Sequence, residues 1–107
     1  MTIYALSSGP GLSGVAIIRA SGPQVRKIIK LLIKGDFPQP RSATYRKIYK
    51  INSDEIIDEG VILWFPGPYS YTGEDMAEFH VHGSRAVIEA IHTSISKIEN
   101  CRLAEPG

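Results

Sequence analysis

The sequence has a single cysteine, Cys101, and it lacks long apolar runs. One thiol cannot form a disulfide within the chain or supply the several thiolates of a zinc cluster, so a reducing cytoplasm is the expected location. No apolar run approaches the roughly 20 residues that a membrane-spanning helix needs. The first residues, Met-Thr-Ile-Tyr-Ala, have neither the basic region nor the apolar core of a signal peptide. We therefore expect a protein that does not associate with a membrane.

Nucleotide-binding motifs are absent or misplaced. No G-x-x-x-x-G-K-[ST] motif occurs, so the chain has no P-loop for a nucleoside triphosphate. Gly9–Gly14 matches G-x-G-x-x-G, but a dinucleotide site needs a helix directly after the glycines. The residues that follow, Val15–Ala20, are instead rich in β-branched side chains. The motif therefore predicts a hairpin loop or a close backbone approach to a ligand.

The charge is unevenly distributed along a chain whose net charge is only +1. Residues 1–50 hold nine Lys or Arg and one acid, whereas residues 51–107 hold three basic residues and ten acids. This asymmetry is compatible with a nucleic-acid surface on the basic half. It fits better with a fold that mixes the two halves, or with a dimer interface across which they meet. The length of 107 residues allows one domain, residues 1–107, and the Pro-Gly ending suggests a piece of a longer protein.

The hydrophobic pattern predicts an α+β fold in the order β-β-α-β-β-β-α. The strands are expected at residues 2–6, 15–20, 42–51, 56–65 and 76–82. The third strand should have Ala43, Tyr45, Tyr49 and Ile51 in phase and form an antiparallel hairpin with the fourth. We expect a mixed or antiparallel sheet with both helices on one face. The polar residues 102–107 are expected to add no further element.

Apolar stripes with helical spacing locate the two helices. The stripes are Val25, Ile28, Ile29, Leu32 and Ile33 in the first helix and Val87, Ile88, Ile91, Ile95 and Ile98 in the second. Pro23 should open the first helix with Ser21 or Gly22 as its cap, and Gly35 should end it. Ser84 should cap the second helix, and Asn100 should mark its end, because the apolar stripe stops before it. The basic side of the first helix, which carries Arg26, Lys27, Lys30 and Lys34, either faces solvent or meets phosphates.

The stretch Pro66–Ser84 contains the side chains best suited to bind a ligand. A loop rich in Pro, Gly and Tyr leads into a strand whose alternation places Met76, Glu78, His80 and His82 on one face. A strand that presents a carboxylate and imidazoles beside a polar loop is a candidate ligand site. Zinc or iron binding by Glu78, His80 and His82 is an alternative, although we assign no metal site. Hydrolysis by Glu74 and Asp75 is disfavoured, because adjacent side chains point apart.

Four segments carry a resemblance to a known family. They are Ile17–Pro23, Ile57–Glu59, Pro68–Asp75 with Glu78 and His82-Gly83, and Arg102–Gly107. The string Tyr-Ser-Tyr-Thr-Gly-Glu-Asp is the most specific of them. Together they resemble the N-terminal domain of the bacterial and organellar tRNA modification GTPases, the MnmE or TrmE family. The resemblance spans essentially the whole chain.

The resemblance implies a folate-binding and dimerisation module, similar in fold to the folate-binding domains of aminomethyltransferases. It implies a tetrahydrofolate derivative of the 5-formyltetrahydrofolate type as ligand and a homodimer. Full-length members act with a flavin-dependent partner protein on carbon 5 of the wobble uridine of tRNA. They hydrolyse GTP with magnesium and potassium in a G domain that is absent here, so this chain should have no GTPase activity alone. The alternative is an assembly module without folate, which contacts a metal or tRNA.

Arg19 and Glu78 match the folate contacts of the family. An Arg within Val-Ala-Ile-Ile-Arg-Ala otherwise needs solvent or a partner. A carboxylate can accept two hydrogen bonds from a pterin ring, and a guanidinium suits a carbonyl or anionic group. Weaker candidates for flanking the ring are Tyr71, His82 and the loop around Gly11. The family's third contact, a Lys, would lie just beyond residue 107; Ser84 replaces a more usual Gly, and Cys101 does not match the family's reactive cysteine.

Overall fold

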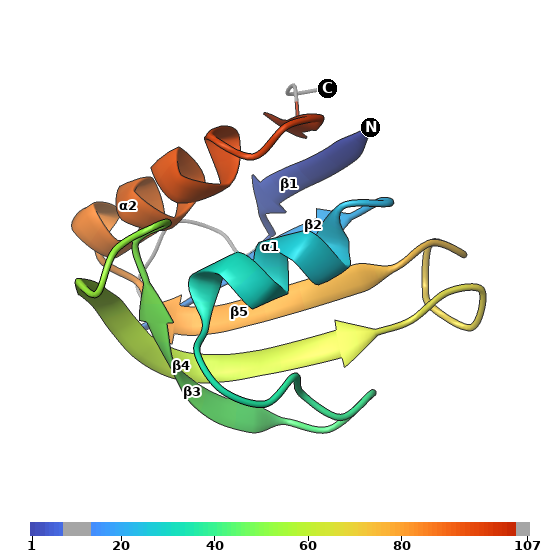
Figure 1. The fold of residues 1–107 in the computed structure, drawn as a ribbon, viewed down its shortest axis with the longest axis horizontal. Helices are drawn as coiled ribbons and strands as arrows, with labels where there is room; N and C mark the ends of the chain where they lie inside the picture. The colour runs from blue at the N-terminus through green and yellow to red at the C-terminus, as the bar shows by residue number, and fades with distance from the viewer. Residues whose placement is uncertain (8–13, 105–107) are drawn as a thin grey trace.

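A computed structural model describes residues 1–7 and 14–104, which form one six-stranded sheet and two helices (Figure 1). The elements are β1 (Thr2–Leu6), β2 (Val15–Ser21), α1 (Val25–Leu32), β3 (Thr44–Tyr49), β4 (Ile56–Phe65), β5 (Met76–His82), α2 (Arg85–Ser96) and β6 (Cys101–Leu103). The strand order is β3-β4-β5-β2-β1-β6, and only the β1–β6 pair is parallel. The predicted mixed α+β fold is therefore confirmed. Neither helix in the described residues is long and apolar enough to cross a membrane.

One face of the sheet packs against both helices, and this layer is the core. The alternate residues Ile18, Phe79 and Ile62 of β2, β5 and β4 are fully buried on this face. They join the buried residues of α1 and α2 in a single apolar cluster. The other phase of each strand forms a face that neither α1 nor α2 covers, which we call the open face. The period-two alternation of β5 thus separates a packed side from an accessible side, as predicted.

Helix α1 begins two residues later than predicted. Ser21 is the last residue of β2, and Gly22, with a φ of 139°, makes the turn that follows. A Cβ at Gly22 would overlap Thr2, so only glycine fits this close approach. The backbone N–H of Gln24 donates to Oγ1 of the buried Thr2 at 2.7 Å. The expected Ser21 or Gly22 cap was wrong, because β2 continues to Ser21 to pair with β5.

Helix α2 begins as predicted and ends early. The backbone N–H of Val87 donates to Oγ of Ser84 at 3.2 Å, which confirms Ser84 as the N-cap. The helix ends at Ser96 rather than near Asn100, which adopts a left-handed φ of 62° and turns the chain into β6. The short strand β6 was not predicted. It is defined by parallel pairing with β1 rather than by a pattern of its own.

The edge strand β3 is shorter than predicted, and its fully buried residue lies outside the predicted set of in-phase residues. Ile48 is the fully buried residue, whereas Tyr45 is 66% exposed. The register shifts between Ile48 and Tyr49, so the regular alternation ends there. The hairpin with β4 and the predicted bounds of β4 are both confirmed.

Candidate functional site

The open face brings Arg19 and Glu78 together at the centre of the sheet. β2 and β5 are antiparallel neighbours, and their register places Arg19 directly opposite Glu78. Nε and Nη2 of Arg19 both donate to Oε2 of Glu78, at 3.0 and 2.6 Å. The Arg19 side chain is 43% exposed and that of Glu78 is 15% exposed. The pair is therefore anchored in the sheet while its cationic member stays accessible.

His80 completes the contacts of Glu78 on the same strand face. Its Nε2 lies 2.9 Å from Oε1 of Glu78. Partial burial acts to raise the pKa of Glu78, but hydrogen bonds from His80 and Arg19 and the charge of Arg19 outweigh it and hold that pKa below its ordinary value. Glu78 is therefore ionised at neutral pH and acts as a hydrogen-bond acceptor.

The loop between β4 and β5 forms a wall beside this pair. The N–H of Gly67 donates to Oδ1 of Asp75 at 2.9 Å, which closes the loop on itself. The hydroxyls of Ser21 and Thr72, 2.8 Å apart, connect the loop to β2. Gly73 adopts a φ of 81°, a conformation that favours glycine. These contacts hold the tyrosine-bearing part of the loop over the open face.

A pocket of about 360 Å³ lies between the loop and the pair. Its lining comprises Arg19, Phe65, Tyr69, Ser70, Tyr71, Met76 and Glu78. A second hollow of about 460 Å³ reaches from Arg19 over β1 to Thr72 and Glu74. Because Arg19 lines both hollows, an elongated ligand can extend from the aromatic pocket across the guanidinium. The combination of flat apolar walls and a few charged groups is typical of a site for a planar heterocycle.

The sequence-predicted site residues fall in three places. Arg19, Glu78 and Tyr71 share the pocket, and Tyr71 is 93% exposed at its rim. Gly11 lies outside the described residues. His82 lines a separate hollow. Phe65, Tyr69 and Met76 also line the pocket but were not among the predicted site residues. Phe65 and Met76 directly flank the loop, and this position could have indicated them.

His82 is held by Asp58 instead of facing the pocket. Nδ1 of His82 lies 2.8 and 3.0 Å from the two carboxylate oxygens of Asp58, and its backbone N–H donates to Oδ2 at 2.8 Å. Partial burial acts to raise the pKa of Asp58, but these hydrogen bonds and one from the Glu59 N–H outweigh it and hold that pKa below its ordinary value. Asp58 therefore fixes the orientation of the His82 ring.

The metal alternative has no support in this geometry. Glu78 contacts Arg19 and His80, whereas His82 contacts Asp58. In the part of the chain that the structure describes, no group of three or more His, Cys, Asp or Glu side chains is placed to hold a metal ion. The polar groups of β5 instead form two separate hydrogen-bonded sets.

The comparison with known proteins decides the family. The family model described as "GTP-binding protein TrmE N-terminus" matches residues 2–107. The chain belongs to the TrmE N-terminal family. It is 70% identical, over its whole length, to the tRNA modification GTPase MnmE of Pelagibacter ubique, of which it covers 24%.

Other relatives of this TrmE N-terminal chain come from bacteria and mitochondria. Over 99% of its length, the chain is 48% identical to the tRNA modification GTPase MnmE of Brucella anthropi, of which it covers 24%. It is 47% identical to the mitochondrial 5-taurinomethyluridine-[tRNA] synthase subunit GTPB3 of Danio rerio, of which it covers 21%. The chain thus spans about a quarter or less of the length of these relatives. The resemblance drawn from Pro68–Asp75 and the other segments is confirmed.

Proposed function

We propose that this domain binds a tetrahydrofolate derivative of the 5-formyltetrahydrofolate type in the pocket beside Arg19 and Glu78. The observation that carries the proposal is an ionised carboxylate beside a pocket lined by Phe65, Tyr69 and Tyr71. A pterin ring is flat and carries N–H donors on one edge, so it needs aromatic walls and a carboxylate acceptor. The proposal includes the expected likeness in fold to the folate-binding domains of aminomethyltransferases.

The existing hydrogen bonds indicate which part of the ligand Glu78 and Arg19 would each contact. A carboxylate offers about four acceptor positions, and Glu78 uses two on Oε2 with Arg19 and one on Oε1 with His80. A pterin edge that contacts both oxygens therefore replaces one of the Arg19 donors. The released donor can then turn to a carbonyl or carboxylate oxygen of the ligand, because Arg19 also lines the second hollow. In this proposal Arg19 and Glu78 bind and orient the ligand and perform no chemistry.

We further propose that the open face mediates dimerisation. A hollow of about 660 Å³ lies on this face, and the apolar side chains of Val15, Val61 and Leu63 line it. Val15 and Tyr45 are 51% and 66% exposed, which is high for large apolar side chains. A second copy of the chain would cover this surface. The same observation favours the alternative function, an assembly module without folate.

The relatives' names support a role for this chain in tRNA modification. We propose that the bound folate supplies the one-carbon unit for carbon 5 of the wobble uridine, in concert with a flavin-dependent partner protein. The sequence has no P-loop. GTP hydrolysis, with its magnesium and potassium, is therefore assigned to a G domain outside this chain. The part proposed for these residues is to hold the donor.

A matched pair of variants tests the folate assignment against the assembly alternative. Glu78→Gln removes the negative charge of the proposed acceptor. Glu89→Gln removes a negative charge from the exposed side of α2. We expect Glu78→Gln to abolish binding of 5-formyltetrahydrofolate in calorimetry and to leave the sedimentation behaviour unchanged, and Glu89→Gln to alter neither. If Glu78→Gln changes the oligomeric state and leaves folate affinity unaltered, the assembly alternative replaces the folate assignment.

A further inference from the structure

The contact between Arg19 and Glu78 uses only one of the two carboxylate oxygens. Nε and Nη2 of Arg19 both donate to Oε2 of Glu78, at 3.0 and 2.6 Å. The same edge of a guanidinium commonly binds both oxygens of a carboxylate through two parallel hydrogen bonds, an arrangement that we call the two-oxygen fork. Between these two described side chains the fork is not formed, and Oε1 accepts no hydrogen bond from Arg19.

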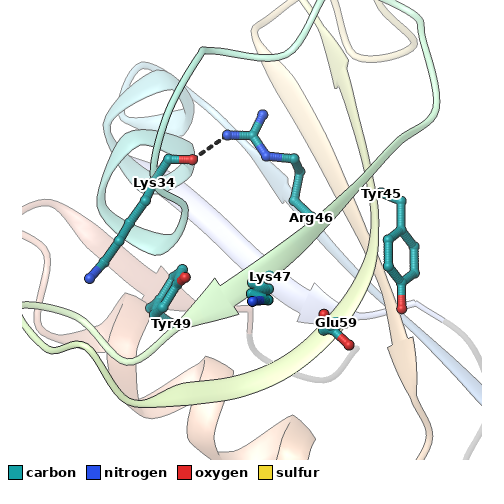
Figure 2. A pocket seen from close by; sticks show the side chains of 6 residues that line it. All are labelled: Lys34, Tyr45, Arg46, Lys47, Tyr49 and Glu59. Carbon is teal, nitrogen blue, oxygen red and sulfur yellow. Dashed lines mark hydrogen bonds between the residues drawn. The ribbon is translucent and has the colours of Figure 1, made fainter.

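Arg46 on β3 bonds differently and provides a comparison within the same sheet. Its Nη1 donates to the carbonyl oxygen of Asp36 at 2.7 Å, and its Nη2 donates to the carbonyl oxygen of Lys34. Figure 2 shows the second of these hydrogen bonds beside a hollow of about 320 Å³ that Arg46 lines. The two donors of Arg46 therefore reach two oxygens, whereas the two donors of Arg19 share one. A competing donor on Oε1 of Glu78 would explain this difference.

His80 is the donor that competes for Oε1. It lies two positions after Glu78 on the same face of β5, and its Nε2 is 2.9 Å from Oε1. An ionised carboxylate only accepts hydrogen bonds, so Nε2 of His80 carries the proton and donates it. Pairing with Val61 of β4 on one side and with Ile17 of β2 on the other holds the backbone of His80 in place. The imidazole therefore competes with the guanidinium from a fixed position.

The contacts of Glu78 decide which part of its carboxylate a ligand can reach. Of the roughly four acceptor positions of a carboxylate, Arg19 occupies two on Oε2 and His80 occupies one on Oε1. The remaining position is on Oε1, so the first N–H of a ligand meets the oxygen that His80 holds. A two-oxygen fork would instead cover the edge that a ring with two parallel N–H donors needs. Keeping Arg19 on a single oxygen therefore keeps Glu78 accessible.

We propose that His80 is a positioning residue of the ligand site, which prevents the two-oxygen fork between Arg19 and Glu78. Among the described residues, His80 does not line the pocket beside Arg19 and Glu78 but lines the hollow of about 660 Å³ on the open face. It therefore acts through Glu78 and does not touch the ligand. The inference rests on the proposed function for the identity of the ligand. Its geometric part concerns only Arg19, Glu78 and His80.

A matched pair of variants at His80 tests the positioning role. His80→Leu removes the donor, whereas His80→Gln keeps an N–H donor at a similar distance from the backbone. In calorimetric titration with 5-formyltetrahydrofolate, we expect His80→Leu to bind about tenfold more weakly than the unmodified chain and His80→Gln to bind within about twofold of it. Equal losses in both variants would contradict the proposal, because the donor would then not be what matters.

A double-variant cycle without ligand tests the fork itself. Urea denaturation of Arg19→Ala, Glu78→Gln and their combination gives the coupling between the two residues, first in the unmodified chain and then in the His80→Leu chain. We expect the coupling to rise about twofold in the His80→Leu chain, because the fork then forms. If His80 merely supported the local structure, its loss would leave the coupling unchanged or lower it, and either result would overturn the proposal.

The two measurements separate this inference from the proposed function. If the unmodified chain binds no 5-formyltetrahydrofolate, the proposed function fails, whereas the cycle still decides whether His80 prevents the fork. If His80→Leu binds the ligand as tightly as the unmodified chain, the positioning role fails and the folate assignment stands. Circular dichroism checks that each variant folds, and His80→Phe, which keeps a ring without the donor, replaces His80→Leu if that chain does not fold. Sedimentation velocity serves as a control, because a loss of folate binding that follows a change of oligomeric state would assign His80 to the open-face interface instead.

Discussion

Nε and Nη2 of Arg19 on β2 both donate to a single oxygen, Oε2, of Glu78 on β5, from directly opposite positions in the sheet. This geometry leaves Oε1 to His80 and keeps the carboxylate ionised. It also makes the stability of the open face depend on both residues. We therefore expect an energetic coupling between Arg19 and Glu78 that can be measured without any ligand.

Replacing Arg19 with Ala should destabilise the chain by about 1 kcal/mol, because Glu78 is mostly buried and loses its charged donors. The loss is small because Arg19 is 43% exposed and solvent screens its interaction with Glu78. Urea denaturation of Arg19→Ala, Glu78→Gln and the double variant measures the coupling. The double variant should lose less stability than the single variants together, and strict additivity would show that the pair contributes nothing.

Stability should fall in acid through Asp58 and Glu78. Both carboxyls have pKa values below their ordinary values in the folded chain, so the unfolded chain takes up protons first as pH falls. Their contribution is complete above about pH 5 and is lost as pH drops through the ordinary values near 4 toward the lower folded values. Urea midpoints measured from pH 6 to pH 3 should decline less steeply in Asp58→Asn than in the unmodified chain. Parallel curves would contradict the assignment.

His92 should make the chain less stable as pH falls below about 6.5. Burial lowers the pKa of His92, so the unfolded state binds its proton first and stability decreases with falling pH. Among the described residues, its buried Nε2 has no hydrogen-bond partner, and its ring packs edge-on against Tyr4 at 5.4 Å. His92→Phe keeps the ring contact and removes the orphaned nitrogen, which should stabilise the chain by about 1 kcal/mol at pH 7. Thermal unfolding at pH 7 and pH 5.5 checks both effects, and an unchanged pH dependence in His92→Phe would refute them.

Gly60 is required where β4 passes β5. A Cβ at this position would overlap the carbonyl oxygen of His80, part of the backbone that cannot swing aside. Gly60→Ala should cost about 2–4 kcal/mol through displacement of the β4–β5 pairing. Gly14→Ala is the control, since a Cβ there has nothing within 4 Å. Similar chemical denaturation midpoints for the two variants would argue against this close approach.

The sequence predicted those features of the fold that depend on local periodicity. The alternation from Met76 to His82 correctly separated the two faces of β5, and Ser84 was correctly identified as a cap because its signal lies within three residues. The strand β6 could not be predicted, because its three residues form a strand only through pairing with β1. The burial of Ile48 was not predicted, because β3 is a short edge strand whose pairing with β4 shifts register after Ile48.

The sequence singled out Arg19 and Glu78 but did not show that they contact each other. Arg19 and Glu78 were identified from their unusual setting and from the family resemblance, yet nothing local sets the β2–β5 register that pairs them across 59 positions. The same holds for Asp58, which orients His82 from 24 positions away. Phe65 and Met76 enter the pocket only because the loop between them folds back. Long-range pairing of this kind is fixed by the whole sheet.

Calorimetric titration of 5-formyltetrahydrofolate into the 107-residue chain tests the central claim most directly. We expect saturable binding of one ligand per chain that Glu78→Gln abolishes, because the Arg19–Glu78 pair and the aromatic wall lie within the described residues. If the chain shows no binding, a longer chain that continues past Gly107, as the relatives do, should be titrated next. Absence of binding in both chains would contradict the folate assignment.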